Sequence, residues 1–166
     1  QGEMIHGVYL YGMRKYGLAE QRVNRALELD PVLVPALTLK AMLCFRHMDY
    51  AGAYDYAGRA LAIDQYDPQA NYISGQAAVR MGKVYDAMDR FEIAAITSEL
   101  RSAALTQLAV IHYTQGDKEL AAEYANKSLV GNSYNLTAYQ ILYQIDPSDE
   151  LLAKIDELDP LCHFAD

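Results

Sequence analysis

The side chains that could bind a metal ion or transfer protons lie far apart in this sequence. A histidine metal site on a helix needs a second ligand three or four residues away, on the same face. None of the four histidines is followed at that spacing by another histidine or a cysteine; they are His6, His47, His112 and His163. The sequence therefore predicts no metal site and no cofactor, and His112 is expected at a buried helical position.

Motifs for nucleophilic or phosphate chemistry are missing as well. No Gly-x-Ser-x-Gly elbow occurs, and the glycines within residues 2–17 follow no strand, as a phosphate-binding loop would require. Cys44 and Cys162 are too far apart in the sequence to form a metal or redox motif. We expect Cys44 to pack in the core without a disulfide to Cys162. Charge pairs such as Asp86 and Arg90 fit the solvated faces of helices, so the chain is predicted not to be an enzyme.

The net charge of −8 is unevenly distributed. Residues 1–102 contain eleven basic and twelve acidic side chains, whereas residues 103–166 contain three and ten. Binding of nucleic acid requires clustered Lys and Arg, so nucleic acid is not an expected partner. We interpret the acidic end as a solvated face, and contact with a basic partner is the alternative.

Small residues recur every thirty-four positions in three separate columns. The columns are Gly7, Ala41, Gly75 and Ala109; Ala19, Ala53, Ala87 and Ala121; and Ala26, Ala60, Ala94 and Ser128. Two helices approach to about 8–9 Å only where the side chains between them are small, so each column indicates helix crossings. A fixed period of this length is typical of helical repeat proteins. We expect one domain with repeats at 1–33, 34–67, 68–101 and 102–133, and a degenerate repeat at 134–166.

Each repeat is expected to fold as a helix, a tight turn and a second helix. Gly82 and Gly116 suit the position just after a first helix, where the backbone often turns left-handed. Breaks between repeats are predicted at residues 29–31, 63–68 and 130–132. In the last repeat Pro147 shortens the first helix. Ser148 is expected to cap a following helix that buries Leu151, Leu152, Ile155 and Leu158.

Several stretches match a known repeat consensus. Residues 26–31, Ala-Leu-Glu-Leu-Asp-Pro, nearly reproduce it, and Gly116-Asp117 followed by Ala121 and Tyr124-Ala125 fits closely. Over roughly residues 2–133 the chain resembles the tetratricopeptide repeat (TPR) family. The resemblance implies an all-α, right-handed superhelical solenoid of about five antiparallel helix-turn-helix repeats. The chain departs from the family pattern in lacking Trp, with Asn71 at a usual Trp position, and in having His6, Lys40 and Ser74 where Leu is usual.

In this family the first helix of each repeat lines a concave groove that binds proteins or peptides. The resemblance places further groove residues in each repeat: Met4, Ile5, Val8 and Tyr11 in the first, Thr38 and Leu39 in the second, Ile73 in the third, and Thr106 and Thr114 in the fourth. The positions selected as the candidate binding surface are Met42, Phe45, Arg46, Tyr72, Gln76, Val79, Arg80, Gln107, Val110 and Tyr113. This surface is apolar and aromatic, with amide and guanidinium groups at its rim. Such a composition suits an apolar or helical segment of a partner.

The groove lacks the charged residues of one TPR subclass. Modules that clamp the C-terminal carboxylate of chaperones need Lys and Asn at two positions of the first helix, and here the first repeat has Met4 and Val8. The later repeats have Thr38 and Met42, Tyr72 and Gln76, and Thr106 and Val110. Chaperone-tail binding is therefore not expected. The expected partner is a protein or peptide segment, or another domain of the parent chain; self-association and a small ligand are alternatives.

The sequence reads as a segment of a longer bacterial protein. It opens without Met inside an expected first helix, and residues 161–164 look like the start of a further element. The ending Asp-Pro-Leu-Cys-His-Phe-Ala is similar to repeat-bearing parts of large bacterial proteins with a carbohydrate-processing domain. The alternative function is therefore an auxiliary scaffold region of such an enzyme. No apolar run approaches the roughly 18 residues of a membrane span, and the compartment, bacterial cytoplasm or periplasm, is left open.

Overall fold

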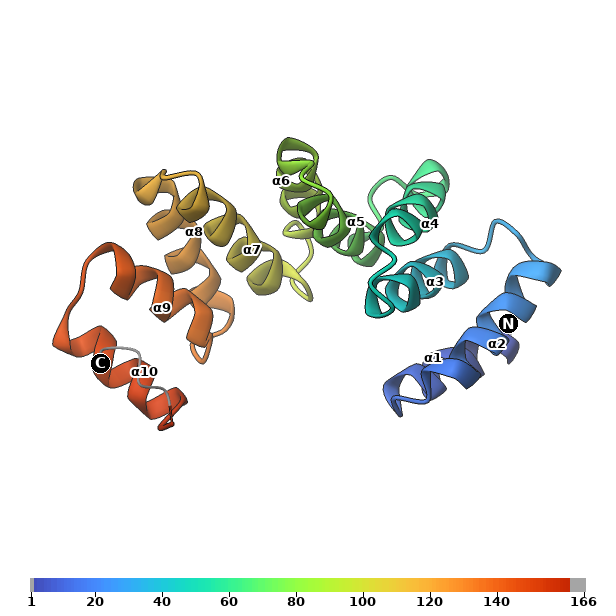
Figure 1. Cartoon of the computed structure of the whole chain (residues 1–166), viewed down its shortest axis with the longest axis horizontal. Helices are drawn as coiled ribbons and strands as arrows, with labels where there is room; N and C mark the ends of the chain where they lie inside the picture. Colours follow the sequence, from blue (N-terminus) through green and yellow to red (C-terminus); the bar gives the residue numbers. More distant parts are fainter. Residues whose placement is uncertain (1, 162–166) are drawn as a thin grey trace. The chain divides into compact units, whose positions relative to one another are not determined.

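The computed structural model describes residues 2–161, which form ten α-helices and contain no strand (Figure 1). The helices are α1 (Gly2–Gly12), α2 (Tyr16–Leu29), α3 (Val34–Arg46), α4 (Tyr50–Ile63), α5 (Pro68–Arg80), α6 (Val84–Ala94), α7 (Arg101–Thr114), α8 (Lys118–Gly131), α9 (Leu136–Ile145) and α10 (Asp149–Leu158). The chain is therefore all-α, as predicted. The expectations for Cys162, His163 and Phe164 fall outside the described residues.

The helices form two compact units, residues 1–94 with α1 to α6 and residues 95–166 with α7 to α10. We call them unit 1 and unit 2. Consecutive helices pack in pairs, from α1 with α2 to α9 with α10. Each pair corresponds to one predicted repeat, although α7 begins at Arg101, one residue before the predicted boundary. That the five repeats act as a single domain stays a prediction.

The three columns of small residues lie inside the helix packing, as their spacing indicated. All twelve residues are buried, and Ala53, Ala87 and Ala121 have no exposed surface. Unit 1 fills the space around its columns with larger side chains such as Val23, Leu43 and Phe91. In unit 2 the corresponding side chains are Leu108, Ile141 and Ile155.

The turns inside the first four repeats place one residue in the left-handed region. Gly82 and Gly116 have φ of 75° and 84°, which confirms the two predicted positions. The equivalent residues thirty-four and sixty-eight positions before Gly82 are Met48 and Arg14, whose φ values are 60° and 57°. Since a side chain with a Cβ adopts this conformation at a cost, the first two repeats contain backbone strain that the later two avoid.

Helix starts are capped by short polar side chains. The side chains of Asp49, Asp67, Asp117 and Asn135 each accept a hydrogen bond from a backbone N–H in the first turn of the following helix. Ser148 does the same for α10, where its Oγ accepts from the Leu151 N–H at 3.2 Å. This confirms the predicted start of the last helix, which buries Ile155 completely. The other three residues predicted to be buried there, Leu151, Leu152 and Leu158, are only half-buried.

The third repeat departs from the regular pattern at its end. Helix α6 has 11 residues, whereas α2, α4 and α8 have 14 each. Residues 95–100 form turns and a bend, and the guanidinium of Arg101 donates to the backbone carbonyls of Ala95 and Ile96, both at 3.0 Å. This segment contains neither Gly nor Pro, so nothing in the sequence indicated the break.

Two polar side chains that replace the usual apolar residues are accommodated by hydrogen bonds. Asn71 is fully buried, and its Nδ2 donates to the backbone carbonyls of Gln65 and Asp67 at 3.0 and 2.9 Å. Lys40 keeps its ammonium 2.7 Å from a carboxylate oxygen of Glu20 on α2. These contacts join neighbouring segments of unit 1 that an apolar side chain would join by packing alone.

Candidate functional site

An apolar hollow lies in unit 1, where the first helices of the first two repeats, α1 and α3, are in contact. One part has a volume of about 440 Å³ and is lined by Met4, Ile5, Val8, Leu33 and Pro35. An adjoining part of about 270 Å³ shares Met4, Val8 and Pro35 and extends along α3 to the start of α5; its further lining residues are Tyr11, Thr38, Leu39, Met42, Asp67 and Gln69. We refer to both parts together as the apolar hollow.

Helix α1 lies beside this hollow and has apolar side chains that are exposed to solvent. Its buried side consists of Met4, Gly7 and Leu10, at the spacing of one helix face. Ile5 and Val8 lie on other faces and are 71 % and 53 % exposed. Exposed apolar side chains beside an apolar concavity are typical of a surface that binds a partner.

One of the ten selected residues, Met42, lines the hollow. Its sulfur lies 3.8 Å from Nε2 of Gln69. Sequence spacing did not indicate Leu33, Pro35, Asp67 or Gln69, which lie next to or within the first turns of α3 and α5. Their position just before or at the start of α3 and α5 could have indicated them in the sequence.

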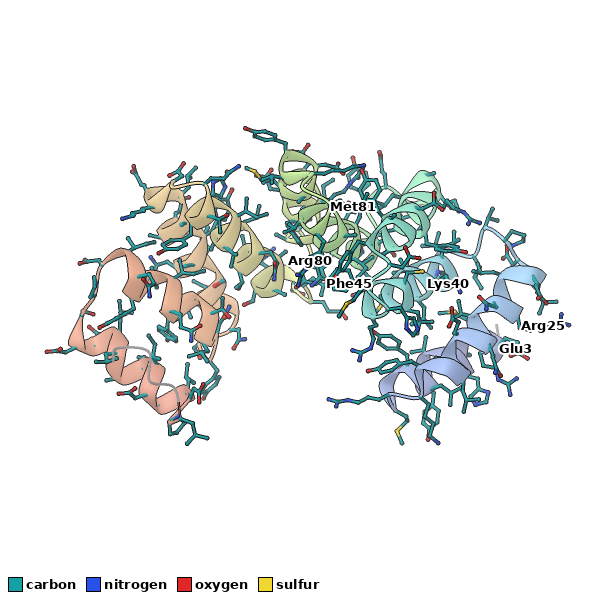
Figure 2. All side chains as sticks on the ribbon, in the orientation of Figure 1. Glu3, Arg25, Lys40, Phe45, Arg80 and Met81 are labelled. Carbon is teal, nitrogen blue, oxygen red and sulfur yellow. The ribbon has the colours of Figure 1, made fainter. Side chains whose placement is uncertain are left out.

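Two selected arginines stack on tyrosines of the preceding repeat. The guanidinium carbon of Arg46 lies 3.9 Å from the ring centroid of Tyr16, and that of Arg80 lies 5.7 Å from the centroid of Tyr50. Each tyrosine also meets an aromatic ring edge-on. Tyr11 packs against Tyr16 with centroids 5.2 Å apart, and Phe45 against Tyr50 at 5.3 Å (Phe45 and Arg80 are labelled in Figure 2).

The two groups are copies of one arrangement, because each residue of the second follows its counterpart by thirty-four positions. We call them the arginine–tyrosine stacks: Tyr11, Tyr16 and Arg46 in the first, Phe45, Tyr50 and Arg80 in the second. Cation–π contacts hold a guanidinium over a ring face and stabilise it by about 0.5–1 kcal/mol at exposed sites. The equivalent residues of a third copy are Val79, Val84 and Thr114, which cannot form it.

The remaining selected residues lie in two separate places. In unit 1, Tyr72 and Gln76 are half-buried and Val79 is exposed; the Tyr72 ring packs edge-on against Phe91 with centroids 5.5 Å apart. In unit 2, Gln107, Val110 and Tyr113 are half-buried, and the last two pack against the core around Ala109 and Ile141.

Two titratable side chains, Tyr11 and Asp67, line the hollow. Burial raises the pKa of Tyr11 above its ordinary value, while the positive charge of Arg46 opposes that rise. Burial also raises the pKa of the Cys44 thiol. His112 is buried, and its ring stacks on Tyr124 with centroids 5.3 Å apart. Within residues 2–161 no group of three or more His, Cys, Asp or Glu side chains is placed to hold a metal ion.

The repeat architecture agrees with a match between this chain and a known family. The model of the family described as Tetratricopeptide repeat matches residues 6–68 and 74–135. The chain belongs to the tetratricopeptide repeat family. The TPR matches cover four of the five helix pairs, and the residues after 135, with α9 and α10, fall outside them.

Solved TPR structures resemble the chain in fold at low sequence identity. PilW, a type IV pilus biogenesis factor, is 18 % identical with a TM-score of 0.85, over 96 % of this chain and 77 % of that one. PilF of Pseudomonas aeruginosa is 19 % identical with a TM-score of 0.81, over 95 % and 72 %. YrrB, described as a TPR protein with an unusual peptide-binding site, is 17 % identical with a TM-score of 0.75, over 98 % and 87 %. No curated protein matches the TPR chain.

None of the helices within residues 2–161 is both long enough and apolar enough to cross a lipid bilayer.

Proposed function

We propose that this TPR chain is a non-catalytic module that binds a segment of another protein, or of another domain of its parent chain. The observation that carries the proposal is the apolar hollow beside α1, with Ile5 and Val8 in solvent at its edge. A hollow of this size accepts one or two apolar side chains of a peptide. The selected residues of the following repeats, from Phe45 to Tyr113, would extend the surface in each unit.

The lining of the hollow suits anchoring by apolar side chains. Met4 and Met42 are flexible and polarisable, so they adapt to partners of different shape. Tyr11, Thr38, Asp67 and Gln69 line the hollow with polar groups that could bond to a peptide backbone. No cation lines the hollow, and a chaperone carboxylate would lose its hydration there without gaining a charged donor. A carboxylate clamp is therefore not proposed.

The peptide-binding site named for YrrB supports the class of partner, because it is found in a similar fold. The support concerns the kind of ligand alone. At 17 % identity the likeness reaches the fold and does not extend to particular residues.

The test is a selection of peptides from a random displayed library on the immobilised protein, followed by affinity measurement of the enriched peptides. We expect enriched peptides to contain two or more apolar residues, and Val8→Asp to weaken their binding at least about tenfold by placing a charge against the buried anchor. Val8 is exposed, so the variant should fold, which circular dichroism would check.

The matched control is Ile63→Asp, which changes an exposed apolar residue at the end of α4, outside the hollow. It should leave the affinities unchanged. Equal affinities of the wild type and Val8→Asp for all enriched peptides would contradict the proposal.

A further inference from the structure

Among the residues that the structure describes, the two stacked arginines of unit 1 have no acidic partner, whereas four of the eight other cations of this unit pair with a carboxylate. Arg22 pairs with Glu3, Arg25 with Glu28 and Lys40 with Glu20, at 2.7–3.1 Å. Within the described residues no carboxylate lies within ion-pairing distance of Arg46 or Arg80, although residues 1–102 contain twelve acidic side chains. Both arginines are exposed.

Stacking prepares these guanidinium groups for an external acceptor. A ring beneath the guanidinium plane holds one of its faces, while the N–H groups point outward from the edges of that plane. These N–H groups match a carboxylate in a bidentate geometry. Because the arginine is already held, less conformational entropy is lost when a partner binds.

The first arginine lies at the edge of the apolar hollow. Tyr11 lines the hollow and packs against Tyr16, on which Arg46 is stacked. The charge of Arg46 reaches Tyr11, whose pKa it lowers against the effect of burial. The second stack repeats this arrangement one repeat further on, at the ends of α3 and α5.

We propose that Arg46 and Arg80 bind two acidic side chains of an extended peptide whose apolar residues enter the hollow. The proposal rests on the proposed function and specifies its ligand: an acidic peptide segment of a partner protein. Charge complementarity favours this occupant, because Arg46 lies beside the apolar hollow, Arg80 repeats its arrangement one repeat further on, and neither cation has an acidic partner in the described part of the chain.

The repeat geometry also predicts the spacing of the acidic residues. Helices that pack against each other, as α3 and α5 do, lie about 8–10 Å apart, and an extended chain advances about 3.3 Å per residue. Two carboxylates bound one repeat apart should therefore be about three residues apart in the peptide.

The experiment compares the peptides that a random displayed library yields on the wild type and on the double variant Arg46→Gln, Arg80→Gln. We expect the wild type to enrich pairs of Asp or Glu about three residues apart, together with apolar residues. The double variant should keep the apolar enrichment and lose the acidic pairs. For a single enriched peptide, each substitution should weaken binding about tenfold, and the loss should shrink as salt is added.

The control variant is Arg59→Gln. The guanidinium carbon of Arg59 lies 5.0 Å from the ring centroid of Tyr56 on the same helix, α4, and Arg59 lines neither part of the hollow. It should leave acidic enrichment intact. An equal loss of acidic enrichment in Arg59→Gln would overturn the proposal, because it would indicate a general effect of positive charge. Displacement of the acidic peptides by inorganic phosphate at millimolar concentration would overturn it for the same reason.

The results also separate this proposal from the proposed function. Apolar enrichment without acidic pairs on the wild type overturns the acidic ligand and leaves the hollow as a binding site. No enrichment of any peptide overturns both.

Discussion

The ring of Phe91 packs directly against the backbone of Gly75, so a Cβ atom at position 75 would lie 2.9 Å from two of its ring atoms. Phe91 is fully buried and cannot move into solvent. The small residue is therefore what permits α5 and α6 to pack at this point.

Gly75→Ala should lower the free energy of unfolding by about 1–3 kcal/mol, because the buried ring must shift to accept the added methyl group. Urea denaturation would measure the change. Gly58→Ala is the control: Gly58 is exposed within α4, a Cβ there meets nothing within 4 Å, and the substitution should raise stability by about 0.5–1 kcal/mol. A loss of stability in both variants would point to the helix backbone and away from the Phe91 contact.

Met48→Gly should raise the free energy of unfolding by about 1 kcal/mol, because Met48 has φ of 60° and its side chain is largely exposed. The reciprocal variant, Gly82→Ala at the equivalent turn with φ of 75°, should lower it by a similar amount. Thermal unfolding of the two variants beside the wild type checks both signs. A destabilised Met48→Gly would mean that the methionine side chain contributes more than its exposure suggests.

The contact between Arg46 and Tyr16 should appear as a coupling free energy of about 0.5–1 kcal/mol in a double-mutant cycle of Arg46→Met and Tyr16→Leu. The short distance between the guanidinium and the ring is the physical reason. Stability of the wild type, the two single variants and the double variant would be measured by urea denaturation. Strict additivity of the single effects would show that the stack makes no contribution.

Asn135→Ala should lower the stability of unit 2 by about 1–2 kcal/mol. Asn135 caps α9 by accepting from the Ala138 N–H, and its Nδ2 donates to Oγ1 of Thr106 at 2.6 Å, across to α7. Asn135→Asp keeps the cap and removes the donor, so its loss should be smaller than that of Asn135→Ala. Hydrogen exchange of the α9 amides would compare the two. Identical losses would show that the bond to Thr106 carries the whole effect.

Tyr54 should make stability fall at high pH. Its hydroxyl donates to Oδ2 of Asp86 at 2.5 Å, and this bond, burial and the Asp86 charge raise the pKa of Tyr54 in the folded chain. In the unfolded chain tyrosine ionises near pH 10. The stabilisation is therefore fully present below about pH 10 and is lost as the pH rises from there through the folded pKa.

The comparison of the wild type with Tyr54→Phe isolates this effect from other titrations. The difference in free energy of unfolding between them should be larger at about pH 8 than at about pH 11. A constant difference across that range would contradict the role of the Asp86 bond.

Much of the fold could be predicted from the sequence because the packing constraint repeats. Positions where two helices cross, such as Ala53 and Ala87, require small side chains, and their regular spacing made them recognisable in the sequence. The Ser148 cap was equally visible, since hydroxyl side chains before an acidic first turn favour helix starts. Local chemistry and period together determined which segments became helices.

Contacts between repeats were harder to predict. Arg46 was selected as a rim cation, yet its ring partner Tyr16 lies thirty residues earlier and in another repeat. The equal spacing of Arg46 with Arg80 and of Tyr16 with Tyr50 was a signal that could have revealed the stacks. The left-handed backbone at Met48 had only an indirect signal, since the glycines of later repeats occupy the same position.

The short helix α6 and the irregular residues 95–100 lie at the boundary in the sequence between the two compact units of this TPR chain. In a regular repeat array, local opening spreads to neighbouring repeats because each repeat is stabilised by the next. A chain divided after Ala94 should instead open in two cooperative parts, so that Gly75→Ala accelerates amide exchange in α5 and α6 and leaves exchange in α8 unchanged. Residues 95–100 would then separate two parts that open independently. A partner that stabilises one part would leave the fluctuations of the other unchanged.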